Sequence, residues 1–381
     1  MIMEANMHIG MIGTRFMGKA HSHAFRSAPS FFDIPFTPVL HTVCGRDNAQ
    51  LQRLALRFGW KHQETSWEKV VENPAIDVVD ICTPNHLHFP VAVAAATAGK
   101  HVLCEKPLAR HEEEAWLMYE TAANAGVVHM TVFNYRFVPA IALAKRLIDE
   151  GKIGQIRHFN AVYFQDWLTD PGFPMVWRHD ASLSGSGAHG DMNAHIVDLA
   201  RFLVGEFAEV NGVQRTFIKE RPMADGSGRG RVTVDDATSF LALFRHGAIG
   251  SFTATRLAPG RKNFLRLEIF GSLGSLLFDL ERINELQYHD GTDGTGFQLL
   301  LVTEPVHPYM EAWWPPGHVI GWEHTFVHVV TQLLGAIHSG LPATPDFFDG
   351  FRCQQVLDAV VSSAASGSWK PIPEITKITP S

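Results

Sequence analysis

Short apolar strands alternate with helices over the first 134 residues, and this alternation constrains the fold more than any other feature. Strands are predicted for residues 8–13, 38–45, 76–83, 101–105 and 127–133. Helices are predicted between them, one of which runs from Asp47, a good N-cap, to Phe58. Such an alternation favours parallel strands joined by right-handed crossover helices. We therefore expect a doubly wound α/β domain over residues 1–134.

The pattern changes over residues 135–381. Predicted strands follow one another there, mostly without an intervening helix, at 156–164, 208–218, 237–244, 248–256, 264–270 and 275–280. Helices are predicted at 139–150, 190–204, 322–338 and 347–365. A run of strands of this kind favours an α+β domain with a large, mostly antiparallel open sheet. Residues 221–231 are glycine-rich and polar, and we expect them to form an exposed loop.

Composition excludes several classes of function. The 381 residues carry a formal net charge of −7 and offer no basic face for nucleic acid. The four cysteines are scattered, which is typical of reduced packing residues, and no apolar run reaches the ~20 residues that span a bilayer. Residues 1–6 lack a basic segment followed by an apolar core. We expect a cytoplasmic protein with no nucleic-acid or membrane partner.

A glycine-containing turn follows the first predicted strand. It reads Gly13-Thr-Arg15-Phe16-Met17-Gly18, a dinucleotide fingerprint in which Arg15 replaces the middle glycine. Gly13 suits the tight turn and Gly18 suits close packing of helix and strand. Arg15 must point away from the pyrophosphate or contact a phosphate through its guanidinium. We expect the whole turn to bind NAD or NADP; a strand–turn–helix without a nucleotide is the alternative.

The end of the second strand bears on the choice of cofactor. An arginine there favours the 2′-phosphate of NADP, whereas a carboxylate favours the ribose of NAD. Arg46 therefore points to NADP. Asp47, one residue later, suits either a ribose contact or a plain helix N-cap. These residues leave both cofactors open.

Polar residues also follow the third and fourth strands, at the edge where doubly wound sheets bind ligands. Thr83 and Asn85 should line the cofactor, although a turn without a ligand is the alternative. Lys106 offers an amine that can hydrogen-bond a reacting hydroxyl and stabilise developing alkoxide charge. The alternative for Lys106 is a solvated lysine at a strand end. Glu105 should contact the nicotinamide ribose.

A carboxylate and an imidazole lie four residues apart in the second region. Asp191 and His195 should share one face of a helix. A histidine has an ordinary pKa of ~6.5 and suits the removal of a hydroxyl proton. Asp191 then holds the imidazole and a substrate hydroxyl, or merely stabilises the helix N-terminus. Packing alone is the alternative for His195.

Four segments resemble the Gfo/Idh/MocA oxidoreductases, and the resemblance covers nearly the whole chain. They are residues 13–21, 82–88, 104–108 and 187–195. Further segments at 133–136, 165–167, 176–178 and 307–309 resemble the levoglucosan dehydrogenase-like sugar dehydrogenases of that family. The resemblance implies NAD(P)-dependent oxidation of a secondary hydroxyl of a sugar, anhydrosugar or polyol, with a slight preference for NAD.

The resemblance also assigns roles to residues. Lys106, Asp191 and His195 are the implied catalytic set. Cofactor contacts are implied for the turn described above and for Arg46, Thr83, Asn85, His88, Glu105, Lys106, Asn134 and Arg178. Sugar contacts are implied for Lys106, Tyr135, Arg136, Asp166, Trp177, Asp191 and His195, although tryptophans are more often core residues. No metal is expected, because His324 and His328 lack a convincing third ligand.

We therefore predict a nicotinamide-dependent dehydrogenase with a cofactor domain at 1–134 and a substrate and oligomerisation domain at 135–381. One alternative is a nicotinamide-dependent glycoside-cleaving enzyme, and another is a non-catalytic sugar or nucleotide sensor. The strands from 237 to 280 carry apolar residues on both faces, as at Phe240, Leu241, Leu243 and Phe244. A homodimer or homotetramer formed through the C-terminal sheet would cover the outer face.

Overall fold

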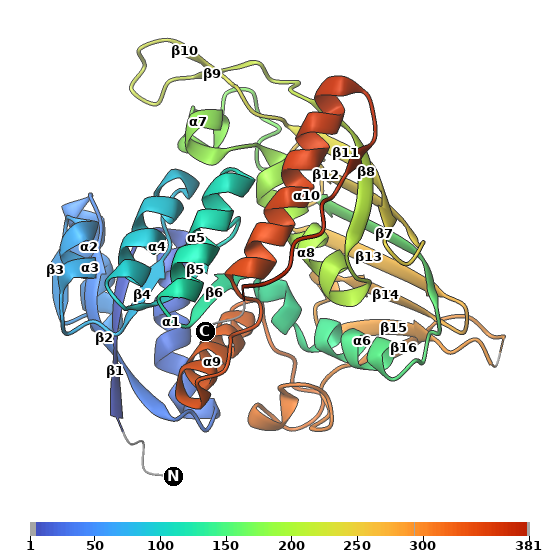
Figure 1. Ribbon diagram of the computed structural model, residues 1–381, viewed down its shortest axis with the longest axis horizontal. Coiled ribbons are helices and arrows are strands. Elements are labelled where there is room, and N and C mark those ends of the chain that lie inside the picture. Colours follow the sequence, from blue (N-terminus) through green and yellow to red (C-terminus); the bar gives the residue numbers. More distant parts are fainter. Residues whose placement is uncertain (1–4, 293, 379–381) are drawn as a thin grey trace. The chain divides into compact units, whose positions relative to one another are not determined.

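The computed structural model describes residues 5–292 and 294–378, which form two compact units (Figure 1). The first unit contains the described residues up to Phe137 together with 321–351 and 376–378, and the second contains 138–320 and 352–375. Residues 321–351 and 376–378 thus group with the N-terminal part, because helix α9 (His324–Ser339) packs against helix α1 (Phe16–Phe31). Most of the N-terminal segment considered above, at 1–4, lies outside the described residues.

The first unit is built on a parallel sheet, which confirms the predicted doubly wound fold. Its six described strands run in the order β3-β2-β1-β4-β5-β6, and every ladder between them is parallel. The strands are β1 (Ala5–Ile12), β2 (Phe36–Cys44), β3 (His62–Glu64), β4 (Val78–Ile81), β5 (His101–Glu105) and β6 (His129–Val132). The remaining helices are α2 (Asn48–Phe58), α3 (Trp67–Glu72), α4 (His88–Thr97) and α5 (Glu112–Asn124), with short turns η1 (Asn85–Leu87) and η2 (Asn134–Phe137).

Local sequence explains where helix α2 begins and ends. Asp47 accepts hydrogen bonds from the backbone amides of Ala49 and Gln50 at 3.0 and 3.1 Å, as a good N-cap does. Gly59 ends the helix in the left-handed conformation, with φ of 81°. The predicted helix from Asp47 to Phe58 is confirmed.

The second unit contains a nine-stranded sheet in the order β16-β15-β14-β13-β7-β12-β11-β8-β17. Within the described chain, its one parallel ladder joins β7 and β12, so the predicted mostly antiparallel sheet is confirmed. The strands are β7 (Ile156–Phe164), β8 (Phe207–Arg215), β11 (Ala237–Phe244), β12 (Ile249–Thr255), β13 (Phe264–Gly271), β14 (Ser275–Asp279), β15 (Glu285–His289), β16 (Gln298–Leu301) and β17 (Lys370–Pro371). The helices are α6 (Pro139–Asp149), α7 (Ala181–Ser184), α8 (Ala194–Leu203) and most of α10 (Phe347–Ser366), with turns η3 (Trp177–His179), η4 (His189–Asn193), η5 (Leu280–Arg282) and η6 (Met310–Ala312).

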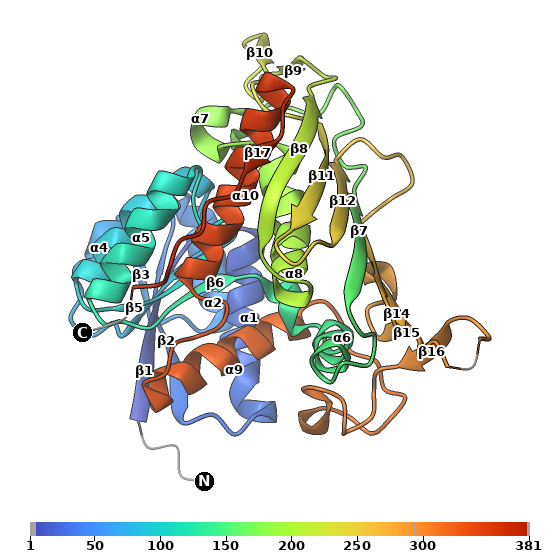
Figure 2. The ribbon, with the colours of Figure 1, turned by 45° about the vertical axis from the view of Figure 1, so that its right-hand side comes forward.

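The two faces of this sheet differ in their cover. Helices α8 and α10 lie on one side of strands β7, β8, β11 and β12 (Figure 2). On that side the rings of Phe240 and Phe252 stack with centroids 4.4 Å apart. On the other side Leu241 is 50% exposed and Ile249 is 46% exposed. The outer face therefore keeps large apolar side chains in contact with solvent.

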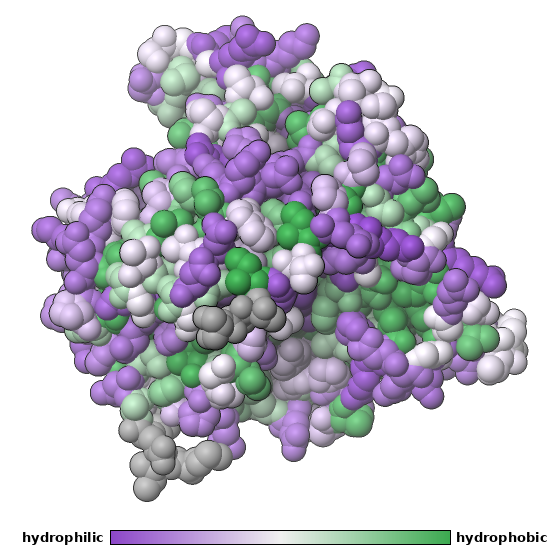
Figure 3. All heavy atoms as spheres, in the orientation of Figure 1, coloured by the Kyte–Doolittle hydropathy of each residue, from purple (hydrophilic) through white to green (hydrophobic). Residues whose placement is uncertain are grey.

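The segment predicted as an exposed loop at 221–231 contains a short hairpin instead. Strands β9 (Glu220–Pro222) and β10 (Arg229–Arg231) pair antiparallel, and the arm they form carries a largely hydrophilic surface (Figure 3). Arg221 at its base is fully buried and donates to the carbonyls of Asp170 and Leu168 at 2.8 and 2.7 Å. Arg221 therefore connects the arm to the loop at 168–173. The prediction of an exposed loop was wrong for the hairpin strands and for Arg221.

In the part of the chain that the structure describes, no helix combines the length and the apolar character needed to cross a bilayer.

Candidate active site

The first turn of the parallel sheet is shaped by close backbone approach. Gly13 has φ of 126°, and a Cβ added there would lie 2.4 Å from the Cys82 carbonyl oxygen. A Cβ on Gly18 would lie 2.2 Å from the Gly13 carbonyl oxygen. Both positions therefore require glycine, and the N-terminus of α1 presents free amides beside the turn. This is the cradle that a dinucleotide diphosphate fits.

The other predicted residues of this turn are accessible. Arg15 occupies the N-cap position of α1, makes no side-chain cap and is exposed. Phe16 is also exposed and stacks on Trp322, with ring centroids 5.2 Å apart, and Met17 is half-buried. An exposed Arg15 is free to place its guanidinium on a phosphate.

Arg46 and Asp47 lie at the end of β2. Arg46 is exposed. The Asp47 carboxylate caps α2, as described above, through one oxygen. Of the two roles left open for Asp47, the structure therefore displays the N-cap.

The loop after β4 contains Thr83, Asn85 and His88. Asn85 is buried, and the hydroxyl oxygen of Thr83 is buried without a hydrogen-bond partner among the described residues. A buried hydroxyl costs free energy unless it is paired, so this atom fits a bound ligand's polar group. The His88 ring is fully buried, with Nδ1 2.9 Å from the Pro107 carbonyl and Nε2 3.0 Å from the Thr83 carbonyl. His88 supports two strand-end loops, and a direct cofactor contact would require its ring to leave them.

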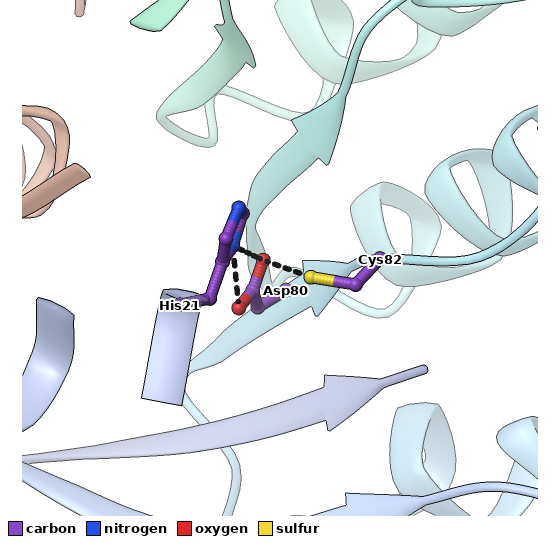
Figure 4. A group of neighbouring side chains, drawn as sticks. All are labelled: His21, Asp80 and Cys82. Atoms are coloured by element: carbon purple, nitrogen blue, oxygen red, sulfur yellow. Dashed lines mark hydrogen bonds and ion pairs between the residues drawn. The ribbon is translucent and has the colours of Figure 1, made fainter. Parts of the chain in front are cut away.

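Glu105 and Lys106 follow at the end of β5. Lys106 is half-buried, and its backbone amide donates to Glu105 Oε2 at 3.0 Å. The other oxygen of Glu105 lies 3.1 Å from Nε2 of His21, a buried residue of α1. His21 Nδ1 lies 2.9 Å from Asp80 at the end of β4, and Figure 4 shows this pair beside Cys82. Glu105 thus makes two protein contacts, and its contact with the nicotinamide ribose stays a prediction.

His21, Asp80 and Cys82 form, within the described chain, a group compact enough to suggest metal ligation. Their polar atoms already bond one another, with Cys82 Sγ 3.7 Å from Asp80. Burial raises the pKa of Cys82 well above its ordinary value, which keeps the thiol protonated. The three side chains therefore already form a hydrogen-bonded cluster with one another.

The loop after β6 contributes Asn134, Tyr135 and Arg136, all buried. Asn134 donates to the hydroxyl of Thr325 at 2.9 Å. Arg136 donates to Asp349 at 3.3 Å, and the Arg136 side chain of this ion pair is only 6% exposed. Their predicted cofactor and sugar contacts stay predictions.

In the second unit, Asp191 lies in a π-helical turn (His189–Asn193), and His195 lies in the first turn of α8. The predicted continuous α-helix over 190–204 is therefore interrupted at its start. Single π turns of this kind occur frequently at functional sites. His195 is buried, with its ring 5.9 Å from that of Tyr163.

Asp235 holds the beginning of the π turn. Its carboxylate accepts the backbone amides of Gly187 and His189 at 2.7 and 2.8 Å. A Cβ on Gly187 would lie 1.8 Å from the Asp235 carbonyl oxygen, so only glycine fits there. These contacts tie the turn to the segment before β11.

Arg256, at the end of β12, holds Asp191 itself. Its guanidinium donates to Asp191 Oδ2 at 2.8 Å and to the Gly187 carbonyl at 3.0 Å, and its side chain is 2% exposed. Arg178 lies 3.9 Å from the same carboxylate oxygen and its guanidinium covers the Trp177 ring at 4.3 Å. Asp191 thus faces two cations and remains 23% exposed for a ligand.

Asp166 is held differently. Its carboxylate pairs with Lys262 at 2.6 Å, and the hydrogen bond from Lys262 lowers the pKa of Asp166. Trp167, beside it, is exposed and donates to Gln165. An exposed indole next to a fixed carboxylate has the composition of a carbohydrate-contacting surface.

Sequence reasoning missed His21, Asp80, Asp235 and Arg256. A charged residue ending an apolar strand, as Arg256 does after β12, was the available signal for one of them. The predicted catalytic residues divide between the units, with Lys106 in the first and Asp191 and His195 in the second.

A dinucleotide cradle in one unit, and a carboxylate and imidazole on a clamped turn in the other, define the class of nicotinamide-dependent oxidoreductases. Residues 7–133 match the model of the "Oxidoreductase family, NAD-binding Rossmann fold", and residues 141–277 match the GFO/IDH/MocA C-terminal domain. The chain belongs to the Gfo/Idh/MocA oxidoreductase family. The predicted family and the nicotinamide dinucleotide cofactor are confirmed.

Individual relatives cover almost the whole chain. A levoglucosan dehydrogenase of Pseudarthrobacter phenanthrenivorans is 44% identical over 388 residues, which is 97% of this chain and 99% of the relative. An oxidoreductase domain protein from Kribbella flavida is 51% identical, with a TM-score of 0.94 over 97% of this chain and 100% of that one. A levoglucosan dehydrogenase in complex with NADH and levoglucosan is 44% identical, with a TM-score of 0.94 over the same shares.

Proposed function

We propose that the chain is a dehydrogenase that uses NAD to oxidise one secondary hydroxyl of a sugar, anhydrosugar or polyol to a ketone. Bound NAD supplies the hydride acceptor at C4 of its nicotinamide. The turn from Gly13 to Gly18 would hold the diphosphate, and the buried Thr83 hydroxyl would bind another polar group of the cofactor. We favour NAD because the levoglucosan dehydrogenase relative is described with NADH.

The observation that carries this proposal is the clamped π turn. Asp235 fixes its backbone and Arg256 fixes the Asp191 carboxylate, while part of Asp191 stays exposed. A structural helix start has no need of a buried guanidinium aimed at an accessible carboxylate. The arrangement is suited to orienting a ligand hydroxyl beside the His195 imidazole.

His195 takes the hydroxyl proton in the proposed reaction, because an imidazole is the side chain best suited to accept a proton at neutral pH. Lys106 would supply an ammonium donor that stabilises negative charge developing on a reacting hydroxyl. Asp191 accepts a hydrogen bond from a neighbouring hydroxyl. Trp177, which lies under Arg178, offers an apolar face for the sugar ring.

A substrate screen tests the proposal. The purified protein is mixed with sugars, levoglucosan and inositols, with NAD and NADP in separate reactions, and reduced nicotinamide is followed by absorbance. We expect reduced cofactor to accumulate far beyond the enzyme concentration with at least one of these substrates, and faster with NAD. A preference for NADP would refute the cofactor choice.

Two other results would refute the dehydrogenase proposal. Cleavage of a glycoside without net cofactor reduction would identify a glycoside-cleaving enzyme. Tight sugar binding without turnover, measured by calorimetry, would identify a sensor.

We also propose a homodimer or homotetramer formed through the outer face of the nine-stranded sheet. The support is the exposed apolar row on that face, which includes Leu241, Ile249 and Val213. A monomer rarely leaves such a row uncovered. Light scattering should give a dimer or tetramer that Leu241→Arg dissociates, whereas a wild-type monomer at micromolar concentration would refute the assembly.

We place the enzyme in the cytoplasm. The support is that no disulfide joins any of the four cysteines, all of them within the described residues, since disulfides are rare in that reducing compartment. Fractionation of the producing cells, with activity recovered in the cytosolic fraction, tests this assignment. Recovery outside the cell would contradict it.

A further inference from the structure

His21 lies between two buried carboxylates. Its Nδ1 is 2.9 and 3.0 Å from the two oxygens of Asp80, and its Nε2 is 3.1 Å from Glu105 Oε1 (Figure 4 shows the Asp80 side). The histidine side chain is 2% exposed, that of Asp80 is 0% and that of Glu105 is 6%. The three groups come from α1, β4 and β5, at sequence separations of 59 and 84 residues. All belong to the first unit.

With both carboxylates ionised, this geometry requires a doubly protonated ring. A neutral imidazole carries one N–H and can donate to one carboxylate only, whereas an imidazolium donates to both. Although burial lowers it, the Asp80 carboxylate raises the pKa of His21 well above its ordinary value. The groups that face the ring are Asp80 and the Cys82 thiol from β4 and its loop, Glu105 from β5, and the uncharged Phe326 ring from α9.

Glu105 links His21 to the backbone of Lys106. Glu105 Oε2 accepts the backbone amide of Lys106 at 3.0 Å, while Oε1 faces His21. The carboxylate is therefore fixed at both oxygens. Any shift of Glu105 moves the backbone that carries the Lys106 amine.

We propose that His21 is a positioning residue for the dehydrogenase reaction, acting as a cationic bridge that fixes the Glu105 carboxylate and, through it, Lys106. This inference rests on the proposed function for the role of Lys106. The predicted consequence concerns charge. Without the imidazolium, the buried carboxylates of Asp80 and Glu105 have no cation between them, and at neutral pH one of the two like charges is neutralised. One carboxylate then takes up a proton, and Glu105 loses its fixed orientation.

The experiment compares His21→Gln with wild type from pH 6 to pH 10, a range spanning the ordinary pKa of histidine. The glutamine amide can still donate to one carboxylate but carries no charge. We expect kcat/KM to fall by about 10- to 100-fold at pH 7, the scale of a lost charge-assisted hydrogen bond. The loss should shrink as pH rises, because both carboxylates ionise. A control, His23→Gln, makes the same change at an exposed position of α1 and should leave activity unchanged.

A second variant separates charge from packing. His21→Gln with Asp80→Asn removes one of the two carboxylates together with the cation. We expect this double variant to regain at least half of the lost activity on a logarithmic scale at pH 7 and to lose the added pH dependence. A packing role predicts the opposite, because the double variant then falls further and equally at every pH.

Two readouts keep this test apart from the test of the proposed function. NADH binding, followed by its fluorescence, reports on the first unit whether or not a sugar is turned over. NMR of ¹⁵N-labelled histidine should show the wild-type His21 ring doubly protonated above pH 7. A neutral His21 ring at neutral pH, or unchanged NADH affinity and activity in His21→Gln, would overturn the proposal. A failure of the wild-type enzyme to oxidise any sugar would leave the NADH and NMR results to decide it.

Discussion

The two units hold their proposed catalytic groups with charges of opposite sign. In the first unit one imidazole lies between two carboxylates, all three side chains being at most 6% exposed. In the second unit one carboxylate, Asp191, faces Arg256 and Arg178, and it keeps 23% of its surface. One cluster is therefore sealed and the other is open to a ligand.

This difference predicts different responses to mutation. A charge left unpaired in the sealed cluster has no access to water, so it must neutralise or move. A charge left unpaired at Asp191 can be solvated through its exposed edge. Changes in the first unit should therefore alter protonation and cofactor binding, and changes in the second should alter turnover.

The largest expected effect is the loss of a reacting group. Lys106→Ala and His195→Ala should each lower kcat by at least ~10²-fold, the usual contribution of a charge-stabilising donor or a general base. NADH affinity should fall with Lys106→Ala and change little with His195→Ala, because only Lys106 lies in the cofactor unit. Steady-state kinetics and NADH fluorescence measure both. Near-normal turnover in either variant would refute its catalytic role.

Removal of the cation behind Asp191 should have the next largest effect. Arg256→Gln should lower kcat/KM by roughly 10- to 100-fold, the scale of one charge-assisted hydrogen bond. Arg256→Lys should recover part of the loss, and NADH affinity should not change. Arg282→Gln, which breaks an exposed ion pair with Glu285 in the same unit, is the control. Equal losses in the glutamine and lysine variants would show that the cationic charge is not what matters.

Acid should destabilise the protein through its buried neutral histidines. Burial lowers the pKa of His328 to about 3 and that of His129 to about 4 in the first unit. In the second unit, burial followed by Arg221, Arg256 and Arg178 lowers the pKa of His179 to about 4. Each unfolded histidine binds its proton near pH 6.5. The stability that a neutral histidine contributes is therefore complete above pH 6.5 and is lost as pH falls towards its folded pKa, by up to about 1.4 kcal/mol per pH unit.

A variant tests this acid dependence. His328→Gln retains a donor for the Phe137 carbonyl, which His328 Nδ1 approaches at 2.8 Å. The free energy of unfolding, from urea titrations between pH 6.5 and 4, should fall less steeply in this variant than in wild type. Identical slopes would show that His328 does not contribute to the loss of stability in acid.

The smallest expected effect concerns the cofactor phosphate. Arg46 is exposed at the end of β2, so Arg46→Ala should weaken NADP by about fivefold more than NAD, the scale of one exposed charge contact. Dissociation constants for both cofactors measure this. The control is Arg53→Ala on the exposed face of α2. An equal loss for both cofactors would show that Arg46 does not read the phosphate.

Local patterns were enough to predict most of the architecture. The parallel strands, the helix capped by Asp47 and the antiparallel run of the second unit all follow from periodicity and capping. The π turn could not be predicted, because the same residues satisfy an α-helical and a π-helical spacing. Arg221 was misread because a glycine-rich, charged segment resembles a loop, and only the carbonyls at 168–173 reveal its buried partner.

The site was predictable where its chemistry lies in short motifs. Lys106, Asp191 and His195 belong to such motifs. The contacts of His21 join residues 59 and 84 positions apart in the sequence, and the contact of Arg256 with Asp191 joins residues 65 positions apart. No local pattern encodes those separations. The groups proposed to react were therefore recognisable from the sequence, whereas the groups that contact them could be found only from the fold.

His88 lies between the loops that follow β4 and β5. Its two ring nitrogens approach the carbonyls of Pro107 and Thr83, and burial lowers the pKa of this histidine, so the ring is neutral. A neutral ring has a single N–H to donate. The two loops therefore share one proton, and each tautomer fastens one loop while releasing the other. Which of the two loops accepts a hydrogen bond from His88 therefore depends on which ring nitrogen carries the proton.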